Sequence, residues 1–225
     1  MKLLDLFCGA GGAAVGYARA GFEVMGVDIA AQKNYPFAFH QGDAIEFLLK
    51  HGHEYDAVHA SPPCQHYSRT KTLAANVDGF QRHCDRIEHP DLIEATPDGL
   101  RFVGVPYIIE NVVGAPLLNP VMLCGTMFDL RVFRHRLLFE SNVSLIAPEH
   151  RRHVGTTNSH RGYSRDADYI CVCGNNYDAK QGREAMGIEW MTSRAELSQA
   201  IPPAYSHFLG TQLMAHLCAL EVAPC

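Results

Sequence analysis

Short apolar runs alternate with helical stretches over the first sixty residues. We expect strands at residues 2–7, 22–27, 37–41 and 55–60, with helices at residues 13–20 and 44–50. Strands and helices that alternate at this spacing form right-handed crossovers, and the strands then lie parallel in one sheet. The pattern therefore predicts an α/β fold whose ligands bind at the carboxyl ends of the strands.

The pattern is less regular further along the chain. Residues 66–89 are polar and irregular, as in a loop that covers a site. A helix is expected from Pro90 until Pro97-Asp98-Gly99 interrupts it, followed by a buried strand at residues 105–112 and a strand with one charged face at residues 134–139. Residues 197–220 regain helical periodicity, with a turn at Pro202-Pro203.

The composition changes between residues 141 and 188, where Gly, Asn, Arg, His and Ser increase and long apolar runs are lacking. We interpret this stretch as a small inserted subdomain. The expected organisation is a catalytic and cofactor-binding domain at residues 1–140, the inserted region at 141–188, and a segment at 189–225 that returns to the first domain. No run of apolar residues is long enough to cross a bilayer, so we expect no membrane association.

Glycines and acidic residues follow the first strands at the predicted binding edge. Gly9-x-Gly11 comes after the first strand, and Asp28 and Asp43 follow the second and third. A glycine turn lets the backbone approach a nucleoside ligand, and an acid about 20 residues later suits a ribose. This arrangement serves enzymes that bind NAD and enzymes that bind S-adenosylmethionine alike.

Three further groups of residues carry chemistry. Cys64 follows Pro62-Pro63 just beyond a buried strand, where a thiolate could add to an electrophilic carbon. Glu110 lies near the end of another strand, and a carboxylic acid there could protonate a ring nitrogen. Arg134 and Arg136 share one face of a strand because alternate residues do so.

These motifs, taken in order along the chain, resemble the DNA (cytosine-5)-methyltransferases, in particular the short Dcm-like forms found in phages. The resemblance rests on five stretches that span nearly the whole chain: 5–12 (DLFCGAGG), 61–65 (SPPCQ), 110–112 (ENV), Arg134-x-Arg136 and 200–205 (AIPPAY). It implies a Rossmann-like fold of the methyltransferases that use S-adenosylmethionine, with a small inserted target-recognition subdomain.

The resemblance also implies the role of each site residue. S-adenosylmethionine would be held by the glycine loop with Phe7, by Asp28 at the ribose and by Asp43 at the adenine amino group; the loop residues concerned are Asp5, Gly9, Gly11 and Gly12. By the family mechanism, Cys64 attacks C6 of a flipped-out cytosine, Glu110 engages N3, and C5 accepts the methyl group. Arg134 would position the cysteine turn and Arg136 would contact the cytosine O2. The loop after Gln65, with Ser68, would contact DNA.

The chain departs from the family pattern at four points. The ribose-binding acid is more often Glu than Asp28, Val132 stands where a glutamine is usual, and Ser198-Gln199 replace Gly-Asn. The fourth departure is the very small recognition region, which implies a short recognition sequence. Our candidates there for phosphate and guanine contacts are four arginines: Arg151, Arg152, Arg161 and Arg165.

Charge supports a localised DNA contact. The whole chain has a formal net charge of -5, which by itself argues against a nucleic-acid partner. Residues 131–165, however, contain seven arginines, no lysine and two acidic residues between two acidic parts of the chain. Guanidinium groups suit planar, bidentate recognition of phosphates and bases. The alternative interpretation is a solvated face.

The eight cysteines indicate a reducing cytoplasm, because a chain of this size needs no disulfides and no secretion signal opens it. Cys171 and Cys173, with His150, His153 and His160 nearby, form a weak zinc signal. We expect no metal, and the alternative for this region is a small core built from Tyr163, Tyr169, Ile170 and Tyr177.

The predicted function is thus methyl transfer from S-adenosylmethionine to cytosine in double-stranded DNA by a monomeric enzyme. The setting would be a bacterial or phage-infected host cell, in the manner of restriction-modification. Two alternatives stay open, namely the same reaction on RNA and a catalytically silent relative that binds DNA.

Overall fold

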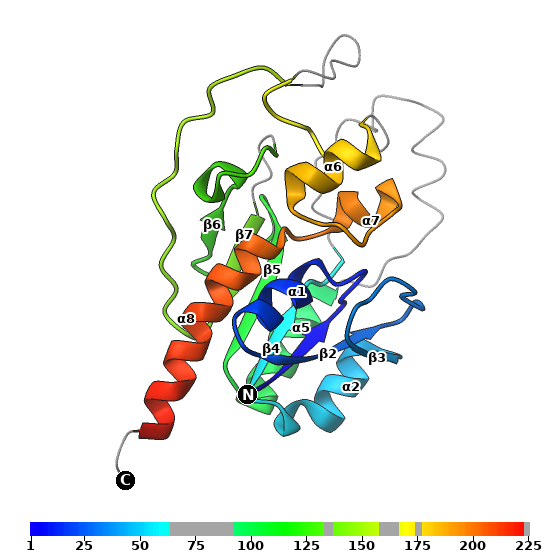
Figure 1. Ribbon diagram of the computed structural model, residues 1–225. Helices are drawn as coiled ribbons and strands as arrows, with labels where there is room; N and C mark the ends of the chain where they lie inside the picture. The colour runs from blue at the N-terminus through cyan, green and yellow to red at the C-terminus, as the bar shows by residue number, and fades with distance from the viewer. Residues whose placement is uncertain (64–91, 133–136, 158–166, 174–176, 223–225) are drawn as a thin grey trace.

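The computed structural model describes residues 1–63, 92–132, 137–157, 167–173 and 177–222. Seven strands form one sheet in the order β3-β2-β1-β4-β5-β7-β6 (Figure 1). Their bounds are β1 Lys2–Leu6, β2 Glu23–Asp28, β3 Ala38–Gln41, β4 Ala57–Ala60, β5 Tyr107–Val112, β6 Val121–Leu123 and β7 Leu137–Ser141. The predicted α/β class is confirmed, and the expected strands in the first sixty residues are present with ends shifted by one or two residues.

The sheet is mixed rather than wholly parallel. The five strands from β3 to β5 run parallel, whereas β7 pairs antiparallel with both β5 and β6. A parallel neighbour needs a crossover, usually a helix, whereas an antiparallel one does not. Only the short 3-10 helix η2, Gly125–Phe128, is described between β6 and β7. The parallel arrangement predicted for the strands of the first sixty residues is confirmed, whereas no direction was predicted for the strand at residues 134–139.

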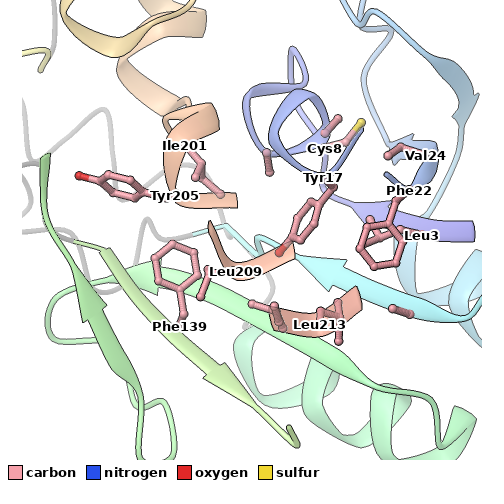
Figure 2. Packing of buried hydrophobic residues seen from close by; sticks show 14 of the residues in the cluster. Leu3, Cys8, Tyr17, Phe22, Val24, Phe139, Ile201, Tyr205, Leu209 and Leu213 are labelled. Carbon is pink, nitrogen blue, oxygen red and sulfur yellow. The ribbon is translucent and has the colours of Figure 1, made fainter. Parts of the chain in front are cut away.

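Both faces of the sheet are buried. Successive residues of β1 enter different core clusters, with Leu3 in one and Leu4 in the other, because side chains alternate across a strand. Helices α1 (Gly12–Arg19) and α8 (Pro203–Val222) pack together over the first face, and α2 (Ala44–His51) with α5 (Leu92–Val103) over the second. Figure 2 shows the first cluster, in which Tyr17 of α1 and Leu213 of α8 are fully buried.

Helix α5 runs through Pro97, where the sequence predicted an interruption. The hydroxyl of Thr96 donates to the Leu92 carbonyl within this helix. Leu100, one turn after the proline, is fully buried in the same cluster as Leu48 of α2. Burial of this face against α2 therefore outweighs the local cost of a proline inside a helix.

A third core cluster lies beside the carboxyl edge of the sheet. It contains Ile170, Tyr177 and Met186, but also Ala10 of the glycine turn and Ala200. Two helices contribute to it, α6 (Ala179–Met186) and α7 (Arg194–Gln199). Of the small core predicted for this region, Ile170 and Tyr177 are buried, Tyr169 is half-buried, and Tyr163 lies outside the described residues. The proposed domain limits stay a prediction.

Within the part of the chain that the structure describes, no helix combines the length and the apolar character needed to cross a bilayer.

Candidate active site

The glycine turn between β1 and α1 depends on backbone angles that suit glycine. Gly9 and Gly11 have φ angles of 49° and 84°, and Gly11 caps the amino end of α1. A Cβ on Gly11 would lie 2.8 Å from Pro36 Cδ, and one on Gly12 would lie 2.5 Å from the Ile201 carbonyl oxygen. The turn is thus held between two other segments, one of which is the 200–205 motif.

Asp28 at the end of β2 holds the turn from the side. Its carboxylate accepts hydrogen bonds from the Gly9 backbone nitrogen at 3.0 Å and from the Ala30 backbone nitrogen at 2.9 Å. Each carboxylate oxygen can accept a second hydrogen bond, so lone pairs remain for hydroxyl groups of a ligand. The sequence suggested a ligand contact for Asp28 but not this support of the loop.

Asp43 lies beside Asp28 because β3 pairs with β2, and the Gly42 nitrogen donates to the Asp28 carbonyl. Oxygen Oδ1 of Asp43 caps α2 by accepting from the Ile45 and Glu46 nitrogens, both at 2.8 Å. The side chain is exposed. The carboxyl ends of β1, β2 and β3 therefore bring the glycine turn, Asp28 and Asp43 to one edge, as the sequence predicted.

Asp5 lies in the core rather than at the surface. Its side chain is fully buried, and the Tyr35 hydroxyl donates to Oδ2 at 3.4 Å. Burial raises the pKa of Asp5 to about 8, and the nearby Asp28 charge acts in the same direction. Asp5 is therefore largely protonated at neutral pH. Phe7, two residues later, is half-buried and has a positive φ of 56°.

Residues in the last third of the chain contact the glycine turn and the loop after β2. The Trp190 indole nitrogen donates to the Ala10 carbonyl at 2.8 Å. Asn34, on the loop after β2, donates to Glu196 Oε1 of α7, also at 2.8 Å. These contacts join segments more than 160 residues apart in sequence.

Glu110 sits near the carboxyl end of β5 and is 9% exposed. Burial raises its pKa to about 8, while a hydrogen bond from the Ser61 side chain acts in the opposite direction. The side chain is therefore largely a neutral acid at pH 7 and can donate a hydrogen bond or a proton. A buried acid kept in this form is suited to a ring nitrogen.

A chain of buried polar side chains leads from α1 to Glu110. The Tyr17 hydroxyl contacts His59 Nδ1, and His59 Nε2 contacts the Ser61 hydroxyl, both at 2.9 Å. Burial lowers the pKa of His59 to about 3, so the ring is neutral and has one donor and one acceptor nitrogen. Ser61, which also bonds Glu110, joins this network to the acid.

Asn111 connects β5 to the turn that precedes Cys64. Its amide nitrogen donates to the Pro62 carbonyl at 2.9 Å, and its side chain is 1% exposed. The Ser61 backbone nitrogen also donates to the Leu6 carbonyl. The backbone is therefore fixed on both sides up to Pro63, the residue before Cys64. Cys64, Gln65 and Ser68 lie outside the described residues.

The two arginines of the predicted pair, Arg134 and Arg136, also lie outside the described residues. The strand that follows them, β7, starts at Leu137, which is opposite Val112 in the register with β5. Sequence analysis placed a strand at residues 134–139, and the described strand reaches Ser141.

Arg151 and Arg152 line a cleft of about 480 Å³. Arg151 forms an ion pair with Asp129, whereas Arg152 has no acidic partner within ion-pair distance among the described residues. Arg131, in the same cleft, donates to the carbonyls of Ala167 and Asp168, so this arginine supports the fold. Arg161 and Arg165 lie outside the described residues.

Sequence reasoning missed the buried supports of the site. Tyr17 and His59 are 42 residues apart, and nothing in the linear sequence connects them. The sequence did contain one signal of these supports, because Asp5, His59 and Glu110 are polar residues within mostly apolar strands.

The surroundings of the turn are compatible with S-adenosylmethionine. Space beside Gly9 is open, since a Cβ there would meet no atom within 4 Å. Asp28 and Asp43 have carboxylate oxygens of the kind that accept hydrogen bonds from hydroxyl and amino groups. Carboxylates also suit the positive charge of a sulfonium.

Comparison with known proteins gives a family for the chain. Residues 1–79 match the model of the C-5 cytosine-specific DNA methylases. The Type II methyltransferase M.FnuDI of Fusobacterium nucleatum is 35% identical over 80 residues, which cover 32% of this chain and 23% of that protein. The Type II methyltransferase M.AgeI of Thalassovita gelatinovora is 31% identical over 178 residues, covering 68% of this chain and 38% of its relative. The chain thus spans well under half the length of either relative.

Solved structures share the fold. A prophage-encoded E. coli protein named as a DNA modification methyltransferase superposes with a TM-score of 0.61 at 14% identity, covering 97% of this chain and 99% of that one. The Entamoeba histolytica methyltransferase EhMeth gives 0.58 at 12% identity and covers 99% of both chains. The predicted Rossmann-like methyltransferase fold is confirmed by these structures. The sequence matches show that this chain belongs to the C-5 cytosine-specific DNA methylase family.

Proposed function

We propose that the protein transfers a methyl group from S-adenosylmethionine to C5 of a cytosine in double-stranded DNA. The observation that carries the proposal is the placement of Glu110. This buried acid has a raised pKa and accepts a hydrogen bond from Ser61. Asn111, the next residue of the same strand, donates to the carbonyl of Pro62, two residues before Cys64. Family membership supports the same reaction.

S-adenosylmethionine supplies the methyl group when bound. The residues of this chain that would hold it are the glycine turn (Gly9, Gly11 and Gly12) with Phe7, and the two acids Asp28 and Asp43. Asp5 is fully buried, so it would support the glycine turn from within the core and would not face the solvent.

Cys64 and Glu110 would activate the base together. The Cys64 thiolate forms a bond to C6, the electron pair of the C5–C6 double bond moves to C4–C5, and the C4–N3 pair takes up the proton of Glu110 at N3. After C5 has accepted the methyl group, a base removes the C5 proton, the C6–S bond breaks and the N3 proton returns to Glu110. These changes restore the thiolate, the acid and the aromatic ring. Which group acts as this base stays open.

The arginine pair would complete the pocket. Arg136 would contact the cytosine O2, and Arg134 would position the turn that carries Cys64. Because C6 is inaccessible in a stacked duplex, the cytosine must leave the helix, and Gln65 and Ser68 would contact the DNA around it.

The cleft at Arg151 and Arg152 would take the DNA backbone. Arg152, which has no acidic partner among the described residues, would pair with a phosphate directly, while Arg151 must first exchange its bond to Asp129. Arg161 and Arg165 would add further contacts. The names of the two curated relatives suggest a Type II modification system. That setting, a phage origin, a cytoplasmic location and a monomeric state stay predictions.

The test compares substrates and variants in one assay of methyl transfer from labelled S-adenosylmethionine. We expect transfer to unmethylated duplex DNA and none to transfer RNA. Cys64→Ala should abolish transfer, whereas Cys218→Ser, an exposed cysteine on α8, should leave it unchanged.

Other outcomes would change the account. Preferential transfer to transfer RNA would favour the same chemistry on RNA. Binding of duplex DNA by the folded wild-type protein with no transfer would favour a silent DNA-binding relative. Full activity of Cys64→Ala would refute the covalent mechanism.

A further inference from the structure

Three potential metal-binding side chains meet outside the candidate active site. Cys124 directly follows β6 and is fully buried, whereas His150 and His153 lie on the extended segment at residues 142–157 that passes this strand (Figure 1). The Cys124 sulfur and one nitrogen of each histidine lie within 4.8 Å of one another. No other group of three such ligands occurs among the described residues.

The spacing of these atoms is close to that around a tetrahedral metal. Cys124 Sγ is 3.2 Å from His153 Nε2, and the Nε2 atoms of His153 and His150 are 3.1 Å apart. With bonds of about 2.3 Å to sulfur and about 2.0 Å to nitrogen, ligands at tetrahedral angles are about 3.3 to 3.6 Å apart. Small movements would therefore admit an ion.

The chemistry of the donors selects the metal. One thiolate and two imidazoles suit Zn²⁺, whereas Mg²⁺ and Ca²⁺ prefer oxygen ligands. Two imidazole nitrogens 3.1 Å apart can form one hydrogen bond, in which one neutral ring donates and the other neutral ring accepts. Binding of zinc would release the thiol proton of Cys124 to the solvent. The hydrogen between the two Nε2 atoms would move to Nδ1 of its own ring, so that both imidazoles bind as neutral ligands.

We propose that Cys124, His150 and His153 form a zinc site in this protein, with water in the fourth position. The histidine pair was noticed in the sequence beside Cys171 and Cys173. In the structure the sulfur next to it is that of Cys124, and neither Cys171 nor Cys173 belongs to a three-ligand group among the described residues.

The site would fasten an irregular segment to the sheet. Residues 142–157 form no helix or strand, so few backbone hydrogen bonds hold them. Arg151 and Arg152 lie between the two histidines in sequence. If the proposed function holds, zinc would also fix the two arginines that we assign to DNA phosphates, but metal binding itself does not depend on that function.

The test measures metal binding directly on the full chain, purified without a histidine tag. After incubation with Zn²⁺ and removal of the excess, we expect about one zinc per chain by elemental analysis. With Co²⁺ in its place, we expect the absorption bands of a tetrahedral cobalt site with a thiolate ligand. Added Zn²⁺ should also raise the melting temperature.

The variants assign the ligands. His150→Ala changes an exposed residue and should weaken zinc affinity at least about tenfold, since losing even an outer-shell partner costs that much. His153→Ala should do the same, and Cys124→Ser should remove the thiolate band. His207→Ala and Cys218→Ser, both exposed on α8, are the matched controls and should bind like the wild type.

Two results would overturn the proposal. One is wild-type protein that retains no zinc and shows no cobalt–thiolate band while remaining folded. The other is zinc that His150→Ala and His153→Ala retain in full but a Cys171→Ser, Cys173→Ser double variant loses.

Discussion

Glu110 shows how one buried side chain acquires a chemical role from its surroundings. A carboxyl group ordinarily titrates near pH 4.5, and burial raises the pKa of Glu110 to about 8. The hydrogen bond from Ser61 stabilises the ionised form and so limits this rise. Ser61 in turn is held by His59, which burial keeps neutral. The network therefore sets the pH range over which Glu110 can act as an acid.

This network predicts the pH dependence of methyl transfer. Because the acid form of Glu110 is required, the rate should fall as the pH rises through about 8. Ser61→Ala removes the bond that lowers this pKa, so the fall should move to higher pH. Glu110→Gln cannot give up a proton and should reduce kcat by about 10² to 10⁴ while the protein still binds DNA. Rate against pH for the three proteins tests this.

A rate profile of Ser61→Ala identical to that of the wild type would show that the serine does not tune the acid. Unchanged kcat in Glu110→Gln would remove Glu110 from the chemistry.

At the level of elements, strand β5 connects the acid to the cysteine turn. Asn111, the residue after Glu110, donates to the Pro62 carbonyl, so the strand that carries the acid also fixes the backbone just before Cys64. The other end of β5 is held in a similar way, since Asn142 accepts from the Tyr107 nitrogen and donates to the Val105 carbonyl. The chain thus offers two asparagines at opposite ends of one strand.

We expect Asn111→Ala and Asn142→Ala to differ in activity more than in stability. Each removes hydrogen bonds to the backbone, which costs on the order of 1 to 3 kcal/mol of unfolding free energy. Only Asn111→Ala should also lower kcat, because only it releases the turn before Cys64. Denaturant melts and steady-state kinetics on both variants measure the two effects. Equal kcat values in the two variants would show that Asn111 serves stability alone.

The sequence predicted elements well where local patterns decide them. The strands and helices of residues 1–60 have clear periodicity, and glycines and acids mark the binding edge. It failed at Pro97, where packing of Leu100 maintains the helix. For β7 the sequence predicted a strand but not its direction, because an antiparallel partner depends on the path of the chain. Helix α6 was missed although Asp178 caps its start and Gly187 its end, because its residues are mostly polar.

The same limit applies to the candidate site. Asp28, Asp43 and Glu110 were found from motifs, since these residues stand at strand ends. The contacts of Tyr17 with His59, of Trp190 with Ala10 and of Cys124 with His153 join distant segments. Such contacts follow from the three-dimensional packing, which no spacing along one chain reveals.

For the whole molecule, the distribution of charge matters more than its sum. The formal net charge is -5, yet three arginines of the arginine-rich stretch, Arg131, Arg151 and Arg152, line one cleft. The structure reduces the number of free cations there, because Arg131 binds two carbonyls and Arg151 pairs with Asp129. Among the arginines of this cleft, Arg152 is the one with neither kind of partner within the part of the chain that the structure describes.

We therefore expect Arg152→Ala to weaken DNA binding more than Arg151→Ala does. The loss should be similar for different DNA sequences and should lower the dependence of affinity on salt by about one counterion. Asp129→Asn, which frees Arg151, should strengthen binding. Titrations of labelled duplex DNA at several salt concentrations measure all three. Unchanged affinity in both arginine variants would show that this cleft is only a solvated face.

The measurement that tests the central claim most directly is bisulfite sequencing of the genome of a bacterial host that has no cytosine-5 methylation of its own. Cells that produce the wild-type protein should contain methylated cytosines at one short recurring sequence, and cells that produce Cys64→Ala should contain none. Unmethylated DNA in cells that hold folded wild-type protein, or equal methylation with Cys64→Ala, would contradict the account.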